Sequence, residues 1–194
     1  EVHQKFINKI SVPLLDGIFI FFSYLIIYFD VDQKLFLIFL SLIFLLGLIS
    51  DLKFIQSAKI RFFLQILIIF LAVITLDLKI SSTRVLIIDN LNENIYFNYL
   101  FVTFCILILI NGSNFIDGLN GLCLGYYSLV IIALMNIGID SSIFLNHEKI
   151  LIILTIFLIL LLNNFLNLLF IGDGGAYVLG LIFSFNLIKI ICIF

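Results

Sequence analysis

The chain has 194 residues, of which 64% are hydrophobic and only 11% are charged, and its formal net charge is −2. Soluble domains hold about 45–50% apolar and about 25% charged residues. A mean hydropathy of +1.34 therefore excludes an ordinary soluble fold and indicates a protein that lies in a lipid bilayer. No basic run points to a nucleic-acid partner.

The apolar runs are continuous and do not alternate with polar residues, which predicts transmembrane helices and not barrel strands. Seven runs are expected to span the bilayer: Leu14–Phe29, Leu35–Ile49, Phe62–Leu76, Ile95–Ile110, Leu122–Ile137, Ile150–Leu162 and Ala176–Phe194. The expected fold is all-α, a polytopic membrane helix bundle of about seven transmembrane helices in one integral membrane domain, residues 1–194. Because the chain begins with Glu1 and ends inside an apolar run, we expect either a truncated form of a larger bundle or a natural short form.

Alternating spans distribute the connecting segments over two faces of the bilayer. The first face carries Lys5, Lys9, Lys53, Lys59 and Arg61, and the second carries Lys34, Lys79, Arg84 and Lys149. By the positive-inside rule this small excess predicts that the first face is cytoplasmic. On the second face, residues 77–94 are expected to form a short hairpin.

The segment "LFIGDGGAYVLG" places Asp173 between glycines, just before the last span. Glycines let the backbone approach a phosphate closely, and a helix that begins near Gly175 or Ala176 would offer it free N–H groups. Asp173 beside that helix end is suited to hold a hard cation such as Mg²⁺. The alternative is an ordinary aspartate cap with glycine turns.

The segment "GLISDLKFIQSAKIRFFLQ" places Asp51 at the end of a span, followed by Lys53, Lys59 and Arg61. An acid with several cations beside it is suited to bind a metal–diphosphate group. The alternative is interfacial anchoring, in which the cations reach the headgroups and the aspartate caps a helix.

The segment "NGSNFIDGLNGL" contains Asn114, Asp117 and Asn120 at intervals of three residues. If the segment is helical, this spacing brings the three side chains near one helix face. One carboxylate and two amides suit a nucleobase, or a second contact to a metal–phosphate group. The alternative is a turn rich in asparagine and glycine.

The same segment resembles the NxxNxxDGxxGL motif of the polyprenyl-phosphate sugar-1-phosphate transferases. These enzymes form glycosyltransferase family 4, with the phospho-MurNAc-pentapeptide translocases and the undecaprenyl-phosphate GlcNAc-1-phosphate transferases. "FIGDGGAYVLG", "GLISDL…SAKIR" and "HQKFINKISVPLLDGIFIF" are similar to three further family motifs, in the family's order. Three positions depart from the pattern: Ser50 and Asn120 stand where acids are usual, and Asp16 stands where a glycine is usual.

The resemblance implies a phosphotransferase in which a polyprenyl phosphate attacks the β-phosphate of a UDP-sugar and releases UMP. It implies Mg²⁺ as the cofactor, with Mn²⁺ as an alternative, and a UDP-N-acetylhexosamine as the expected donor. The enzyme would be a multi-pass protein of the bacterial inner (cytoplasmic) membrane, would act at the cytoplasmic face, and would start cell-surface glycan synthesis. A homodimer is compatible with this expectation.

By resemblance, Asp173 is the metal ligand, and Asp51 and Asp117 are catalytic acids that support the metal, position the nucleophile or accept a proton. The resemblance assigns substrate binding to Asn114, Asn120, Asn163, Phe170 and Lys9. Phe170 would stack on uracil, and Asn163 would line the same pocket wall. Two other functions stay open from the sequence: a membrane transporter, and a catalytically inactive relative that binds lipid or a partner.

Overall fold

The structure is a computed structural model that describes residues 14–28, 34–136 and 147–191. Within these ranges it contains eight helices and no strands: α1 (Asp16–Tyr28), α2 (Lys34–Asp51), α3 (Ala58–Thr75), α4 (Leu86–Asn92), α5 (Ile95–Ile116), α6 (Leu122–Asn136), α8 (His147–Phe165) and α9 (Gly172–Ile191). Every predicted span corresponds to a helix. Five of the helices, α2, α3, α5, α8 and α9, are long and apolar enough to cross a membrane, while α1 and α6 are shorter. The prediction of an all-helical polytopic bundle is confirmed.

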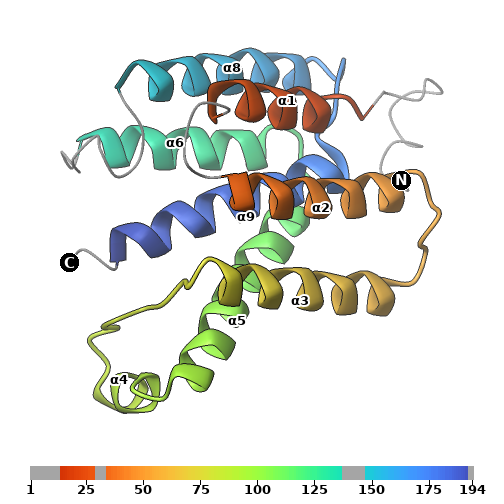
Figure 1. The fold of residues 1–194 in the computed structure, drawn as a ribbon. Helices are drawn as coiled ribbons and strands as arrows, with labels where there is room; N and C mark the ends of the chain where they lie inside the picture. Colours follow the sequence, from red (N-terminus) through yellow and green to blue (C-terminus); the bar gives the residue numbers. More distant parts are fainter. Residues whose placement is uncertain (1–13, 29–33, 137–146, 192–194) are drawn as a thin grey trace.

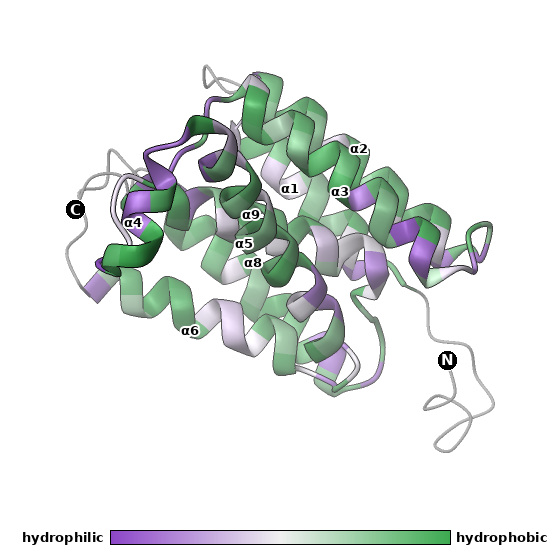
Figure 2. Cartoon of the chain, turned by 90° about the horizontal axis from the view of Figure 1, so that it is seen from below, coloured by the Kyte–Doolittle hydropathy of each residue, from purple (hydrophilic) through white to green (hydrophobic). Residues whose placement is uncertain are grey.

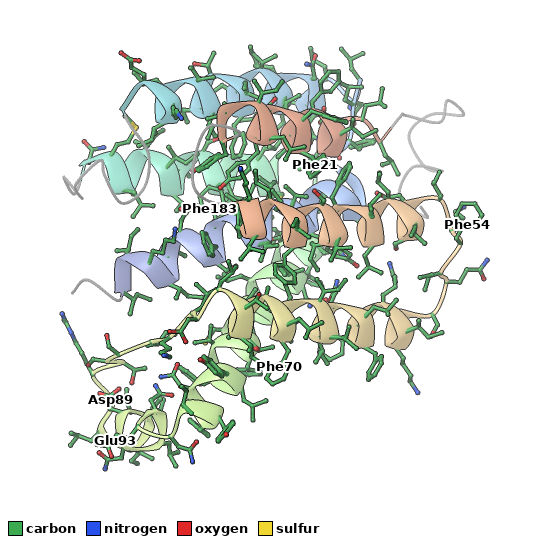
Figure 3. The ribbon with its side chains drawn as sticks, viewed as in Figure 1. Phe21, Phe54, Phe70, Asp89, Glu93 and Phe183 are labelled. Carbon is green, nitrogen blue, oxygen red and sulfur yellow. The ribbon has the colours of Figure 1, made fainter. Side chains whose placement is uncertain are left out.

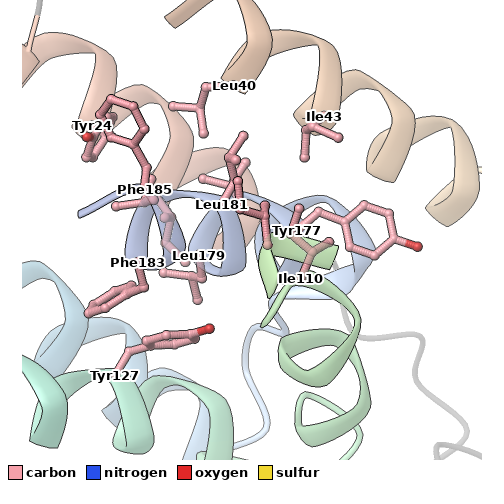
Figure 4. Close-up of a cluster of buried hydrophobic side chains, with 14 of the residues drawn as sticks. Tyr24, Leu40, Ile43, Ile110, Tyr127, Tyr177, Leu179, Leu181, Phe183 and Phe185 are labelled. Atoms are coloured by element: carbon pink, nitrogen blue, oxygen red, sulfur yellow. The ribbon is translucent and has the colours of Figure 1, made fainter. Parts of the chain in front are cut away.

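Helix α9 lies at the centre of the bundle, with α1, α6 and α8 on one side and α2, α3 and α5 on the other (Figure 1). Its apolar window is 83% buried, against at most 39% for the other long helices. Figure 4 shows why, since side chains of α9 such as Leu179 and Phe183 point into a cluster formed by its neighbours. A helix that is apolar all round, as α9 is, belongs in such a central position.

The outer helices direct apolar side chains outward. The long helices are hydrophobic over most of their length (Figure 2), and many of their large apolar side chains are exposed. Phe54, in the connection between α2 and α3, projects outward with 79% of its surface exposed (Figure 3). In water such a surface would aggregate, whereas in a bilayer it contacts lipid.

Glycines bring the first turn of α9 into close contact with α1 and α2. A Cβ atom on Gly17 would lie 2.6 Å from the backbone nitrogen of Gly175, and one on Gly47 would lie 2.4 Å from the Cα of Gly174. Small residues at helix crossings allow this approach, which supplies much of the packing energy between helices in lipid. The amino-terminal end of α9 is therefore held between the ends of two other helices.

One sequence expectation was wrong, and one predicted helix is longer than its apolar run. Residues 77–94 do not form a hairpin, because residues 86–92 fold into α4, and the Asn98 side chain bonds both the N–H and the C=O of Ile80. Helix α5 does not end at Ile110 but continues to Ile116. The polar side chains of Asn111 and Ser113 are satisfied within the helix, because each donates to a carbonyl four residues earlier.

Candidate functional site

The site begins at the carboxyl end of α2, where the chain places Asp51 as the last helical residue. Asp51 Oδ1 accepts a hydrogen bond from the backbone N–H of Asp173 at 2.9 Å, and Oδ2 accepts one from that of Gly174 at 3.0 Å. These two N–H groups belong to the first turn of α9 and have no partner within that helix. Asp51 thus caps α9 from a different helix, with its negative charge at the positive end of the helix dipole.

This cap explains where α9 begins. The sequence predicted a start near Gly175 or Ala176, but the helix starts at Gly172, whose φ of +71° favours glycine. A Cβ atom on Gly172 would lie 2.8 Å from Asp51 Oδ2. The free N–H groups that the sequence offered to a phosphate are therefore bound in part by Asp51.

Asp173 forms the charged centre of the site with Arg61 of α3. Arg61 Nη1 lies 2.5 Å from Asp173 Oδ2, and the side chains are only 24% and 16% exposed. The Ser50 hydroxyl donates to the same carboxylate oxygen and accepts from the same Arg61 nitrogen. Ser50, Arg61 and Asp173 form a triangle that joins the ends of α2, α3 and α9.

A layer of buried amides and hydroxyls lies beneath this triangle. Gln65, one turn further along α3 than Arg61, is 1% exposed and accepts a hydrogen bond from Asn111 of α5 at 3.0 Å. The Tyr177 hydroxyl faces Gln65 and the charges of Asp173 and Arg61, and it points away from the apolar side chains around it (Figure 4). The site therefore has a polar floor that connects α3, α5 and α9.

A second polar group centres on Asn164, which is 2% exposed. Its side chain accepts from the N–H of Gly121 and donates to the carbonyl of Leu169 at 3.2 Å. Beside it, Asn120 donates to Asn167. The loops before α6 and before α9 are thereby fixed to each other at the end of the bundle that carries the charged triangle.

The other predicted residues have the following positions. Asp117 follows the last residue of α5 and its N–H donates to Ser113, while Asn114 lies within the last turns of α5. Asp117 is six residues beyond Asn111, which corresponds to about 9 Å of helix rise. Among the described residues, no three His, Cys, Asp or Glu side chains are grouped closely enough to hold one metal ion. The structure thus joins Asp51 to the turn of Asp173, and it does not group Asp117 with them around a single ion.

Two more predicted residues are located in or near the loop before α9. Asn163 is half-buried near the end of α8, where its carbonyl accepts from Leu168, and Phe170 is half-buried with its carbonyl bound to the N–H of Asp16. Asn120 is exposed and outside any helix, so it does not continue the helical face of Asn114. Lys9 lies outside the described residues.

The sequence did not indicate four members of the site. Ser50 donates a hydrogen bond to Asp173, and the polar floor of the site consists of Gln65, Asn111 and Tyr177. One signal was available, because Gln65 is a lone amide within an apolar helix, and intramembrane polar groups are functional candidates by default. The partners of these residues come from distant parts of the chain, so no local pattern could identify them.

The structure also changes the charge count of the two faces. Lys189 lies near the end of α9 and lines the same hollow as Lys34 at the start of α2, so it belongs to the second face. If Lys5 and Lys9, which lie outside the described residues, are kept on the first face as the sequence predicts, each face has five of the 10 Lys and Arg residues. The positive-inside rule no longer favours either face as cytoplasmic.

Comparison with known proteins identifies one family. The model of glycosyl transferase family 4 matches residues 34–191, which is well over half of the chain. No curated protein and no solved structure shows significant similarity to the chain. The matched range contains the whole charged triangle and its floor.

Proposed function

The chain belongs to glycosyl transferase family 4, and we propose that it transfers a sugar 1-phosphate from a UDP-sugar to polyprenyl phosphate, releasing UMP. The observation that carries this proposal is the group of Asp51, Arg61 and Asp173 at the adjoining ends of three helices. Helix ends lie at the membrane surface, where a soluble nucleotide can meet a lipid whose tail stays in the bilayer.

The reaction needs charge neutralisation more than a strong base. A phosphomonoester has a second pKa of about 6, so the attacking phosphate is largely ionised at neutral pH. Arg61 is suited to bind the donor diphosphate, because its side chain carries a permanent positive charge and is 24% exposed beside Asp173. In this proposal the Arg61 guanidinium contacts a phosphate oxygen while the Asp51 cap keeps the turn of Asp173 in place.

The donor set fits a magnesium ion. Asp173 Oδ2 accepts hydrogen bonds from Ser50 and Arg61. Oδ1 accepts no hydrogen bond from the described residues and is available to a cation. Mg²⁺ is usually held by one or two carboxylates, waters and substrate phosphates, so it does not need three protein acids. Bound there, Mg²⁺ (or Mn²⁺) would neutralise the diphosphate and the leaving UMP. Asp117 would support the nucleophile from the end of α5.

We assign the nucleotide to the residues that the family resemblance indicated. Phe170 would stack on the uracil, and Asn163, Asn114, Asn120 and Lys9 would bind the rest of the nucleotide. A UDP-N-acetylhexosamine is the proposed donor, and the site would face the cytoplasm of a bacterial inner membrane, where the product starts a cell-surface glycan.

The test is a panel of UDP-sugars, each added to membranes that contain the protein, polyprenyl phosphate and Mg²⁺, with UMP release as the readout. We expect release with at least one UDP-N-acetylhexosamine, dependent on both lipid and metal. No release with any donor would contradict the proposal. Labelled UMP should exchange into the UDP-sugar only when polyprenyl phosphate is present, and exchange without lipid would indicate a covalent enzyme intermediate.

A catalytically inactive, lipid-binding relative is the second candidate. It is favoured by the hydrogen bonds of the site, because backbone N–H groups already bind Asp51, and Arg61 already binds one oxygen of Asp173. Ser50 also stands where an acid is usual in the family. In that case polyprenyl phosphate should bind to the purified protein without any metal-dependent UMP release.

A further inference from the structure

A hollow opens at the other end of the bundle, on the second face. It lies between the start of α2, the segment after α3 and the last turns of α9, and its volume is about 330 Å³. Its lining consists of two lysines and five apolar side chains: Lys34, Leu35, Phe36, Leu76, Leu78, Phe185 and Lys189. The Asp51–Asp173 group is at the opposite ends of α2 and α9, so the two sites are separate (Figure 1).

The two lysines of this hollow have no acidic partner among the described residues. Lys189 Nζ lies over the ring of Phe185, 4.3 Å from its centroid, and neither ammonium group makes an ion pair or a hydrogen bond there. Asp77, just past Leu76, forms an ion pair with Lys79 at 2.8 Å and accepts a hydrogen bond from the Tyr99 hydroxyl. Within the part of the chain that the structure describes, two positive charges without an acidic partner therefore border one apolar hollow, an arrangement that attracts an anion.

The floor of the hollow is apolar and well packed. Phe36 and Phe185 are stacked with their ring centroids 4.0 Å apart, and both are at least 96% buried, while Leu78 is 8% exposed. Leu35 is 53% exposed and continues this apolar surface outward. A free inorganic anion would gain nothing from such a surface, but a lipid chain would be buried on it.

The depth of the hollow in the bilayer also suits a lipid. Helices α2 and α9 have 18 and 20 residues, lengths of about 27–30 Å that match the hydrocarbon thickness of a bilayer. Lysines at the helix ends therefore lie at the level of the lipid phosphates, where each contributes to binding of anionic lipids.

We propose that this hollow binds an anionic phospholipid, with its phosphate between Lys34 and Lys189 and an acyl chain along Leu35 and the Phe36–Phe185 pair. The proposal does not depend on the transferase function. It concerns the opposite membrane face and residues outside the charged triangle.

The test is native mass spectrometry of the full chain in detergent, titrated with dioleoyl phosphatidylglycerol. We expect the double variant Lys34→Gln/Lys189→Gln to bind this lipid roughly 25-fold more weakly than the wild type, about fivefold for each lysine. The matched control is Lys79→Gln/Arg84→Gln, which removes the same charge from the same face and should retain wild-type binding.

Three outcomes would overturn the proposal: equal binding by the wild type and the Lys34/Lys189 variant, equal binding of phosphatidylcholine, or displacement of the lipid by millimolar inorganic phosphate. A second measurement avoids dependence on the variant's folding. Photoreactive phosphatidylglycerol should cross-link the wild-type protein at peptides that contain Leu35 or Leu76, and cross-links elsewhere only would contradict the assignment.

Discussion

Asp51 Oδ1 accepts a hydrogen bond from the backbone N–H of Asp173 at 2.9 Å, so the acid that ends α2 caps the helix whose first turn contains Asp173. The two aspartates therefore have different tasks. Asp51 is directed at the backbone of the turn and fixes its position, while Asp173 presents its side chain to Arg61 and Ser50. Substitution of Asp51 and substitution of Asp173 should therefore affect different properties of the protein.

Asp51→Ala should lower stability as well as activity. It removes two hydrogen bonds and a favourable charge from the first turn of α9, and losing a helix cap costs about 0.5–2 kcal/mol. Asp51→Asn should lose less, because an amide oxygen can still accept one of these bonds. The measurement is the free energy of unfolding in a mixed-micelle denaturant titration; equal stability of Asp51→Ala and wild type would contradict the capping role.

Asp173→Asn should abolish metal-dependent UMP release while the protein still inserts in the membrane. The amide removes the charge that binds Arg61 and, in the proposed function, the metal ion. The assay is transfer at several Mg²⁺ concentrations, with membrane insertion followed by fractionation. Asp89→Asn on the opposite face is the matched control and should keep full activity; wild-type turnover by Asp173→Asn would refute the metal assignment.

Gly47→Ala should destabilise the bundle by about 1–3 kcal/mol, as overpacking of a close contact does. The added Cβ would lie 2.4 Å from the Cα of Gly174, a backbone atom that cannot move without shifting the site. Gly112→Ala is the matched control, because a Cβ on that helical glycine would have no heavy atom within 4 Å apart from its chain neighbours and the backbone of its own helix. Thermal unfolding of both variants in detergent tests this, and equal losses would show that the α2–α9 contact is unimportant.

The segment before α4 should loosen at acidic pH. Hydrogen bonds from the Thr83 backbone, and then from its hydroxyl, hold the pKa of Asp89 below its ordinary value of 3.8. A carboxyl whose pKa is lower in the folded state stabilises that state fully above its ordinary pKa, and this contribution is lost as the pH falls through the folded pKa. Stability of the segment should therefore be constant near neutral pH and should decrease below about pH 4.

Hydrogen exchange of the Thr83 amide is the measurement for this acid transition. Protection, corrected for intrinsic exchange, should fall below pH 4 in the wild type. In Asp89→Asn, protection should be low and independent of pH across the same range. A wild-type profile without any acid transition would show that Asp89 does not hold this segment.

Much of the fold followed from the sequence because apolar composition and continuous hydrophobic runs leave helices as the only spanning elements. The two places where the structure differs from the apolar runs have local explanations. Asn111 and Ser113 seemed to end a span, yet their side chains bond within α5 and the helix continues. The Asp77–Asn94 segment offered no strong pattern, and its helix α4 depends on Asn98 from the next element.

The sequence by itself determined the membrane class, the helical form of the seven apolar runs and the motifs that indicated the family, because these depend on composition and short-range spacing. The alternation of spans also placed Asp51 and Asp173 at one end of the bundle. Only the tertiary structure decided what the two acids bind. The Asp51 cap joins residues 122 positions apart, and the Arg61–Asp173 pair joins residues 112 positions apart. Such contacts depend on how glycines let α1, α2 and α9 approach, and no local pattern of residues encodes that geometry.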